Sequence, residues 1–168
     1  MVTAATKYGA TGEIAQAIAT ALTERGVTAV LLPPQQVTAL EGYEAFVLGS
    51  AVYTGHWLPE AMALVQRGAG SWAGRPVWLF SSGPVGDPGK ALTKKMGVDP
   101  VDLPKIRAAT GAREHRMFPG KLDRKNLSFG QRAGLALFRS MQGDFRDWDA
   151  IRDWSAGIAD VLHQAPAR

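Results

Sequence analysis

VTAATKYGATGEIAQAIATALTERG, residues 2–26, joins a short β-prone run to a helix through one turn. The run Val2–Thr6 predicts a strand that ends in this turn. In the segment Gly12–Arg25, apolar side chains recur at every fourth position, which predicts an amphipathic helix. These side chains are Ile14, Ile18 and Leu22. Gly26 stands where a glycine commonly ends a helix.

The rest of the chain repeats this alternation of strand and helix. Further apolar runs predict strands over Val27–Leu32, Tyr43–Ser50, Pro76–Ser81 and Arg113–Phe118. A second amphipathic helix is expected to end before Gly68, and a last one over Trp148–Leu162 with Asp147 as its N-cap. The apolar face of the last helix is expected to hold Trp148, Ile151, Trp154, Ile158 and Val161. Short strands that alternate with helices predict an α/β fold, a doubly wound parallel sheet of five strands with helices on both faces.

The length of 168 residues suits a single domain over residues 1–168. An insert of about residues 120–143 separates the last strand from the last helix. Within it, Leu127–Met141 is expected to be a helix, because Ser128 and Gln131 have capping-box spacing. Arg132 and Arg139 are expected on a different face of that helix from its apolar residues. Such a basic amphipathic helix either lies on a membrane or over a bound ligand, or packs over a sheet edge with its basic side chains in solvent.

Composition limits the chemistry of the chain. There is no Cys and there are only three His, which excludes disulfides, thiolate nucleophiles and Fe–S ligation and disfavours a multi-histidine metal site. Redox chemistry would therefore need a bound organic cofactor. No stretch approaches the roughly 18–20 apolar residues that span a bilayer. Because the N-terminus enters the first apolar run directly, we expect no signal peptide and a cytoplasmic location, with peripheral membrane contact through the basic insert.

The net charge of +4 is unevenly distributed. Residues 105–139 contain nine Lys or Arg and two acidic residues, an excess of +7. Such a basic segment indicates an anionic partner, such as a membrane surface, an acidic protein or a carboxylate-bearing substrate, or else a merely solvated face. We expect no nucleic acid partner.

Three loops are expected at the carboxyl ends of the strands, where doubly wound sheets bind ligands. The first is Thr6-Lys7-Tyr8-Gly9-Ala10-Thr11. Its hydroxyls, its glycine and the free amides of the following helix suit a phosphate. It has neither the Rossmann glycines nor the Walker lysine pattern, which disfavours dinucleotides and nucleoside triphosphates. An ordinary capped turn is the alternative interpretation.

The other two loops suit a flat ring. Ser50-Ala51-Val52-Tyr53-Thr54-Gly55-His56-Trp57 offers aromatic side chains and backbone groups to such a ring. Alternatively, Trp57 only fastens the following helix to the core, and His56 is a surface residue. The third loop, Ser81-Ser82-Gly83-Pro84-Val85-Gly86, is small enough for its amides to reach the polar edge of a ring. Asp87, which follows it, is expected to be a turn or cap residue.

In their order and spacing, these loops resemble those of the flavodoxin family over nearly the whole chain. The chain most resembles the flavodoxin-domain subfamily that includes menaquinone-dependent protoporphyrinogen IX dehydrogenase. The segments that carry this resemblance are Lys7–Thr11 with Glu13–Ala15, Gly49–His56, and the insert from Gly120-Lys121-Leu122-Asp123 to Gly143-Asp144-Phe145-Arg146-Asp147-Trp148. Two positions depart from the pattern. Tyr8 replaces a usual hydroxyl or small polar residue, and Thr54 stands where the dehydrogenase often has an aromatic.

The resemblance implies flavin mononucleotide (FMN) as the cofactor, with the first loop at its phosphate and the other two at its ring. It further implies an oxidoreductase that takes electrons from an anionic hydrophobic substrate, such as a porphyrinogen with its propionates, and passes them to a redox partner or quinone. An electron-carrier flavodoxin and a relative that binds a deazaflavin coenzyme are the alternatives. No residue is identified as a catalytic acid or base.

Overall fold

Four parallel strands form the centre of the computed structural model, which describes residues 1–83, 99–122 and 143–164. These strands are β1 (Val2–Ala5), β2 (Phe46–Tyr53), β4 (Val77–Ser82) and β5 (Glu114–Phe118), in the order β1-β2-β4-β5. The helices are α1 (Ala10–Glu24), the 3-10 turn η1 (Pro34–Gln36), α2 (Pro59–Arg67), α4 (Leu103–Thr110) and α6 (Trp148–Gln164). Three shorter strands, β3 (His56–Trp57), β6 (Lys121–Leu122) and β7 (Gly143–Asp144), complete the elements.

The register of the sheet brings the strand ends together. Ala5 of β1 pairs with Ser50 of β2, and Ser50 pairs with Ser81 of β4. Both pairings are between parallel strands, so the chain leaves β1, β2 and β4 at the same edge of the sheet. The three loops singled out in the sequence therefore start from neighbouring points.

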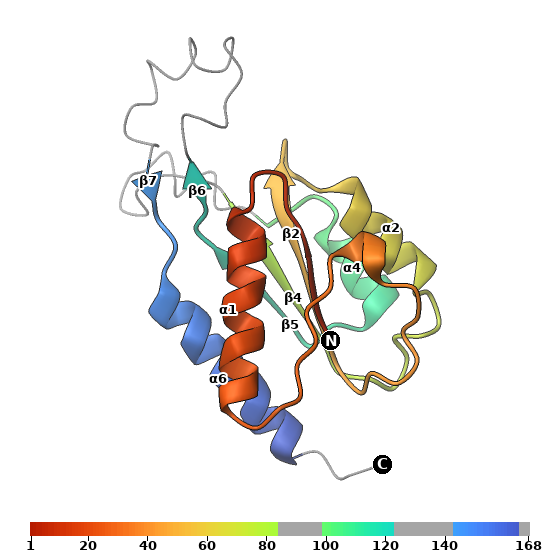
Figure 1. Cartoon of the computed structure of the whole chain (residues 1–168). Coiled ribbons are helices and arrows are strands. Elements are labelled where there is room, and N and C mark those ends of the chain that lie inside the picture. The colour runs from red at the N-terminus through yellow and green to blue at the C-terminus, as the bar shows by residue number, and fades with distance from the viewer. Residues whose placement is uncertain (84–98, 123–142, 165–168) are drawn as a thin grey trace.

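Helices cover both faces of the sheet, as predicted (Figure 1). Helices α1 and α6 pack on one face, against a buried cluster that includes Val47, Trp78 and Phe80. Helices α2 and α4 pack on the other, against Leu48 and Leu79. Successive strand residues point to opposite faces, so strands buried on both sides are continuously apolar. The predicted doubly wound α/β fold is confirmed.

The predicted strand Val27–Leu32 is reduced to a parallel bridge between Leu31 and Val2. The N–H of Val2 donates to the carbonyl of Val30 (2.8 Å), and the N–H of Leu32 donates to the carbonyl of Val2 (3.1 Å). Pro33 and Pro34 follow directly and have no N–H to extend the ladder. The segment lies beside β1, at the edge of the sheet, and pairs with it in parallel through this single bridge in place of a fifth parallel strand.

The last helix begins as predicted. The Asp147 carboxylate accepts the N–H of Ala150 (2.9 Å), which is the N-cap hydrogen bond. Val161, which the sequence placed on the apolar face of this helix, is 36% exposed. Leu162, four residues after the buried Ile158, continues the buried stripe instead, and Val161 lies at its rim.

Helix α4 was not predicted. Its apolar anchors, Leu103 and Ile106, are three residues apart and are both buried. The other residues of the helix are mostly charged or small, so these two side chains do not form a recognisable amphipathic pattern. Gly111, with a φ of 64°, ends the helix. This helix covers the sheet beside β5 and, as shown below, supports the candidate site.

The insert begins and ends in a two-stranded ribbon. Lys121 of β6 pairs antiparallel with Asp144 of β7, and Leu122 pairs with Gly143. The predicted helix Leu127–Met141 lies outside the described residues. Within the described ranges, no helix has the length and apolar character needed to cross a bilayer.

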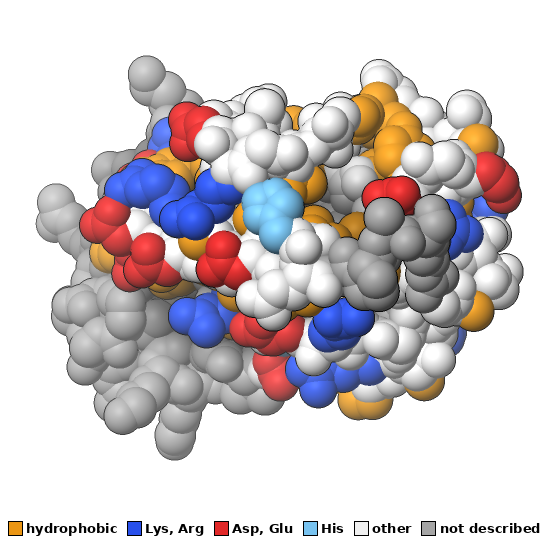
Figure 2. Space-filling view, turned by 90° about the horizontal axis from the view of Figure 1, so that it is seen from below, with side chains coloured by type: hydrophobic (Ala, Val, Ile, Leu, Met, Phe, Trp, Pro, Cys, Tyr) orange, Lys and Arg blue, Asp and Glu red, His pale blue; other side chains and the backbone are white. Residues whose placement is uncertain are grey.

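Charges of both signs are mixed on the surface. Acidic and basic side chains lie beside one another over the described part of the face in Figure 2. The described part of that face therefore carries no separate basic patch.

Candidate functional site

The loop between β1 and α1 turns on Gly9. This residue has a φ of 89°, a left-handed conformation that favours glycine. Its N–H donates to the hydroxyl oxygen of Thr6 (3.0 Å), and its carbonyl accepts the N–H of Glu13 (2.9 Å). Thr6 is exposed, whereas Thr11 is 2% exposed. The loop thus presents Thr6 at the surface.

The same loop packs against the start of α1. A Cβ added to Gly12 would stand 3.4 Å from the Thr6 methyl group. The first amides of a helix have no acceptor within it, and the helix dipole makes this end positive. An exposed hydroxyl beside such amides suits a phosphate group.

The second predicted loop is a hairpin, which corrects its boundary. β2 continues past Ser50 to Tyr53, and β3 returns antiparallel, pairing His56 with Tyr53. Thr54 and Gly55 form the turn with φ values of 51° and 83°. Two positive φ values are typical of a type I′ turn, which matches the twist of paired strands. The sequence predicted a loop here because Thr54 and Gly55 are small and polar, and such residues are found in two-residue hairpin turns as well as in loops.

The first loop and the hairpin meet at the rim of the site. The rings of Tyr8 and Tyr53 contact edge to face with centroids 6.3 Å apart. The Lys7 ammonium lies 5.6 Å from the first ring centroid and 4.9 Å from the second. Burial, and then the neighbouring Tyr8, raise the pKa of Tyr53. Both rings remain more than a third exposed, so they are available to a ligand at this edge.

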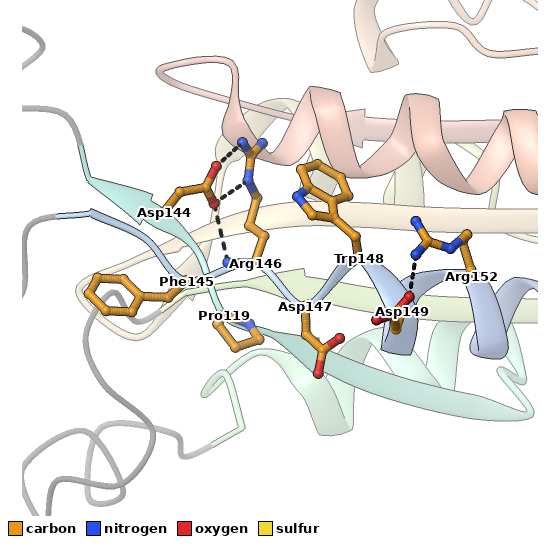
Figure 3. Close-up of a pocket in the computed structure, with 8 residues that line it drawn as sticks. All are labelled: Pro119, Asp144, Phe145, Arg146, Asp147, Trp148, Asp149 and Arg152. Carbon is orange, nitrogen blue, oxygen red and sulfur yellow. Dashed lines mark hydrogen bonds and ion pairs between the residues drawn. The ribbon is translucent and has the colours of Figure 1, made fainter.

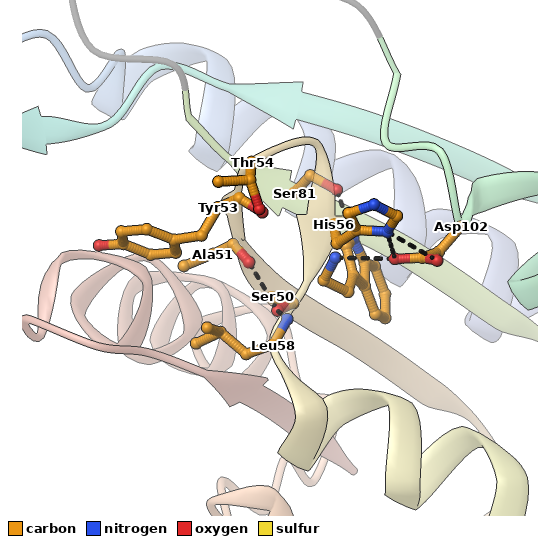
Figure 4. Close-up of polar contacts among 9 residues, drawn as sticks. Ser50, Ala51, Tyr53, Thr54, His56, Leu58, Ser81 and Asp102 are labelled. Carbon is orange, nitrogen blue, oxygen red and sulfur yellow. Dashed lines mark hydrogen bonds and ion pairs between the residues drawn. The ribbon is translucent and has the colours of Figure 1, made fainter.

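Asp102, which the sequence did not single out, ties the hairpin to the start of α4 (Figure 4). Its carboxylate lies 3.1 Å from Nδ1 of His56 and accepts the backbone N–H of Trp57 (3.0 Å). The N–H of Val101 donates to the carbonyl of Gly55 (2.8 Å). His56 is thus an exposed residue held by a carboxylate. Only the position of Asp102 before a helix start could have suggested its role.

Buried serines hold the hairpin from below. The Ser50 hydroxyl donates to the Ala51 carbonyl (2.8 Å) and accepts the N–H of Leu58 (2.9 Å). Trp57 is 3% exposed, and its indole N–H donates to Ser81 (2.8 Å). Of the two interpretations of Trp57, the geometry supports the structural one, because its ring packs in the core.

Ser81 and Ser82, the first two residues of the third predicted loop, belong to β4, and only Gly83 of the loop itself is described. Ser82 is buried, and Gly83 leaves the sheet with a φ of 128°. Its N–H donates to the carbonyl of Phe118 (3.1 Å), which fixes the direction in which the chain departs. Pro84, Val85, Gly86 and Asp87 lie outside the described residues.

A pocket of about 650 Å³ lies at the base of the insert (Figure 3). It is lined by Pro119, Asp144, Phe145, Arg146, Asp147, Trp148, Asp149 and Arg152. Its charged groups already have partners, since Arg146 binds Asp144, Arg152 binds Asp149 and Asp147 caps α6. Among the described residues, the lining therefore offers no free cation to an anionic ligand.

Arg146 links the base of the insert to the start of α1. Its side chain is 3% exposed and lies 2.6 Å from Glu13 and 2.5 Å from Asp144. The guanidinium also lies 4.4 Å from the ring centroid of Trp148. The hydrogen bond from Arg146 holds the pKa of Asp144 below its usual value. Glu13 belongs to the first turn of α1, so the base of the insert is fastened beside the helix start that the first loop precedes.

Comparisons with known proteins agree with this architecture. A flavodoxin from the domain Archaea is 15% identical, with a TM-score of 0.62 and 97% of each chain covered. Oxidised Flavodoxin 1 from Bacillus cereus is 16% identical, with a TM-score of 0.61 and coverage of 98% of this chain and 97% of that one. Rubredoxin oxygen:oxidoreductase from Desulfovibrio gigas is 14% identical, with a TM-score of 0.56, 96% of this chain and 35% of that chain. At these identities the likeness shows the fold.

The family follows from a separate match. No curated protein matches the chain significantly. The model of the family described as "Flavodoxin domain" matches residues 1–149, most of the chain. The chain therefore belongs to the flavodoxin domain family, whose cofactor is FMN.

Proposed function

We propose that this chain holds FMN at the β1, β2 and β4 ends and acts as a quinone-linked oxidoreductase of the protoporphyrinogen dehydrogenase type. The observation that carries the proposal is the meeting of two loops at one sheet edge. Tyr8 of the first loop contacts Tyr53 of the hairpin, directly beside the start of α1. The start of α1 and the two aromatic rings therefore lie side by side, which supports a site for a phosphorylated flat ring.

The residues present fit FMN. Thr6 and the first amides of α1 would hold the phosphate, with the Lys7 ammonium nearby. The rings of Tyr8 and Tyr53 would contact the isoalloxazine system, and the segment Ser82–Gly83 would approach its polar edge. Tyr8 brings a large aromatic side chain to the first loop, where the family usually has a hydroxyl or small polar residue, so the loop amides would carry more of the phosphate contact.

FMN, when bound, supplies the capacity to accept and release electrons. In each turnover the proposed reaction transfers two electrons and two protons from the reduced tetrapyrrole to a quinone, which leaves as the quinol, and successive turnovers complete the oxidation of the porphyrinogen to the porphyrin. The chain binds and orients the reactants and excludes water. We assign no acid or base to it.

Two features favour an enzyme over a carrier. The insert resembles that of the dehydrogenase subfamily, and Arg146 fastens its base to α1 beside the proposed phosphate site. The pI of about 9.6 also differs from the acidic character usual for carrier flavodoxins. An electron carrier is the second candidate, because two flavodoxin structures align with almost the whole of this chain and over almost the whole of their own length.

Anaerobic turnover separates these candidates. The FMN-loaded protein is mixed with protoporphyrinogen IX and a menaquinone, and porphyrin fluorescence is followed. Repeated turnover that depends on the quinone is expected. Slow, quinone-independent exchange with a flavodoxin reductase, and nothing else, would favour the carrier. A single long-wavelength absorption band of a co-purified deazaflavin would exclude the FMN proposal.

Replacing the exposed hydroxyl of Thr6 is expected to weaken FMN binding. Thr6→Ala removes one contact to a charged phosphate. FMN binding should therefore weaken by about 1–3 kcal/mol in free energy, which raises the dissociation constant. Isothermal titration of FMN measures this. Thr6→Ser keeps the hydroxyl and should bind like the unchanged protein. Riboflavin, which lacks the phosphate, should bind both variants equally. An equal loss of riboflavin affinity would mean that Thr6 does not act at the phosphate.

A further inference from the structure

A buried chain of hydrogen bonds runs beneath the hairpin, from Trp57 to the surface. The indole Nε1–H of Trp57 donates to the Ser81 hydroxyl (2.8 Å), and this hydroxyl lies 2.8 Å from Nε2 of His115. Nδ1 of His115 lies 3.2 Å from the carboxylate of Asp99. Ser81 is 0% exposed and the His115 side chain 2%, whereas Asp99 is 64% exposed.

The order serine, histidine, aspartate is that of a hydrolase triad, but this serine is not a nucleophile. Ser81 lies wholly inside the protein, and its oxygen already accepts the indole N–H of Trp57. A triad serine must reach a substrate carbonyl. The arrangement therefore acts on Trp57 rather than on a substrate.

The partners fix the tautomer of His115. An indole N–H can only donate, so the Ser81 oxygen accepts from Trp57. The serine proton then needs an acceptor, and among the described residues Nε2 of His115 lies within hydrogen-bond distance. Nε2 can accept only without a proton, so the imidazole proton is on Nδ1 and faces Asp99. Every donor in the chain of hydrogen bonds is then satisfied.

The charged groups around His115 also affect its ionisation. Burial lowers the pKa of His115 from its ordinary value of 6.5. The carboxylate of Asp99 raises it, Arg107 of α4 lowers it, and the neighbouring Glu114 raises it. Because burial is the largest of these effects, the imidazole is neutral at neutral pH.

We propose that neutral His115 is a positioning residue of the candidate flavin site, orienting Ser81 so that Trp57 holds the ring-binding hairpin in place. Protonation at Nε2 would give Ser81 a second donor and leave its own buried hydroxyl proton without an acceptor. Trp57 and the hairpin would then lose their fixed support. This inference rests on the proposed FMN site, but its first test does not need FMN.

The first test is nuclear magnetic resonance of the protein without flavin. Imidazole ¹⁵N shifts are expected to report Nδ1–H for His115 at neutral pH. The indole N–H resonance of Trp57 should shift with the same apparent pKa as His115, below 6.5. His115→Gln keeps an acceptor but does not titrate, so Trp57 should stay at its neutral-pH position. An Nε2–H tautomer, or a Trp57 resonance that ignores His115, would overturn the proposal.

The second test is the pH dependence of FMN affinity. Between about pH 8 and pH 5, the unchanged protein is expected to lose on the order of tenfold more affinity than His115→Gln. The FMN phosphate also titrates near pH 6. This affects the unchanged protein and His115→Gln equally, so the difference between their losses of FMN affinity reports on His115. His163→Gln, the same change at an exposed histidine, should follow the unchanged protein.

The outcomes separate the two proposals. If FMN fails to bind at any pH, the proposed function fails, and the Trp57 and His115 resonances still decide the role of His115. If FMN binds with the same pH profile in the unchanged protein and in His115→Gln, the positioning role is refuted and the FMN site stands.

Discussion

Gly49→Ala is expected to destabilise the protein by about 3 kcal/mol, near the upper end for overpacked cores. The added Cβ would lie 2.2 Å from two ring carbons of Phe80. Phe80 is fully buried and packs against the rings of Phe118 and Trp154, so it cannot move aside. Urea unfolding at neutral pH measures the loss.

The control is the same change at a site with space. Gly157 lies in α6, and a Cβ added there meets nothing within 4 Å. Gly157→Ala is therefore expected to stabilise the protein by about 0.5–1 kcal/mol, because alanine favours a helix. Phe80→Leu, which makes room, should offset part of the Gly49→Ala loss in the double variant. Equal effects of Gly49→Ala and Gly157→Ala would contradict the packing described.

Arg146→Met is expected to destabilise the protein by roughly 2 kcal/mol. The change removes a buried guanidinium that pairs with Glu13 and Asp144 and lies over Trp148. Breaking a fully buried ion pair costs about 3–5 kcal/mol, but both carboxylates here are partly exposed, which reduces the loss. Thermal and urea unfolding measure it. Arg146→Lys, which keeps the charge but loses the two-pronged contact, should lie between.

The same variant predicts a dependence on pH. Arg146 lowers the pKa of Asp144 in the folded protein, so the folded state holds the proton less tightly than the unfolded state. This stabilisation is present above about pH 4 and is lost as the pH falls through the folded pKa. The stability difference between the unchanged protein and Arg146→Met should therefore narrow in acid. A difference that stays constant down to pH 2 would show that packing, not charge, is responsible.

The sequence predicted the fold well because its signals were local. Every-fourth-residue spacing located α1, and continuous apolar runs located β2 and β4, since strands buried on both faces have no polar side. The predicted strand Val27–Leu32 shrank to one bridge because two prolines follow it. Helix α4 was missed because two apolar residues three positions apart do not form a recognisable period.

The candidate site was predicted less completely. The position of the loops at one edge of the sheet could be predicted, because the carboxyl ends of parallel strands share an edge, but the contact between Tyr8 and Tyr53 was not predicted. The hairpin at Thr54 and Gly55 could not, since composition does not distinguish a two-residue turn from a loop. Asp102, His115 and Arg146 act through partners more than thirty residues away in sequence. Such contacts depend on the assembled fold and leave no local pattern.

Titration with FMN and with riboflavin, followed by flavin fluorescence and absorption, most directly tests whether the strand-end loops form a flavin site. One FMN per chain is expected to bind at micromolar concentration or below, with perturbed absorption bands, and riboflavin should bind far more weakly because it lacks the phosphate. A protein that leaves the FMN spectrum unchanged at these concentrations, or that binds both flavins equally, would contradict the account.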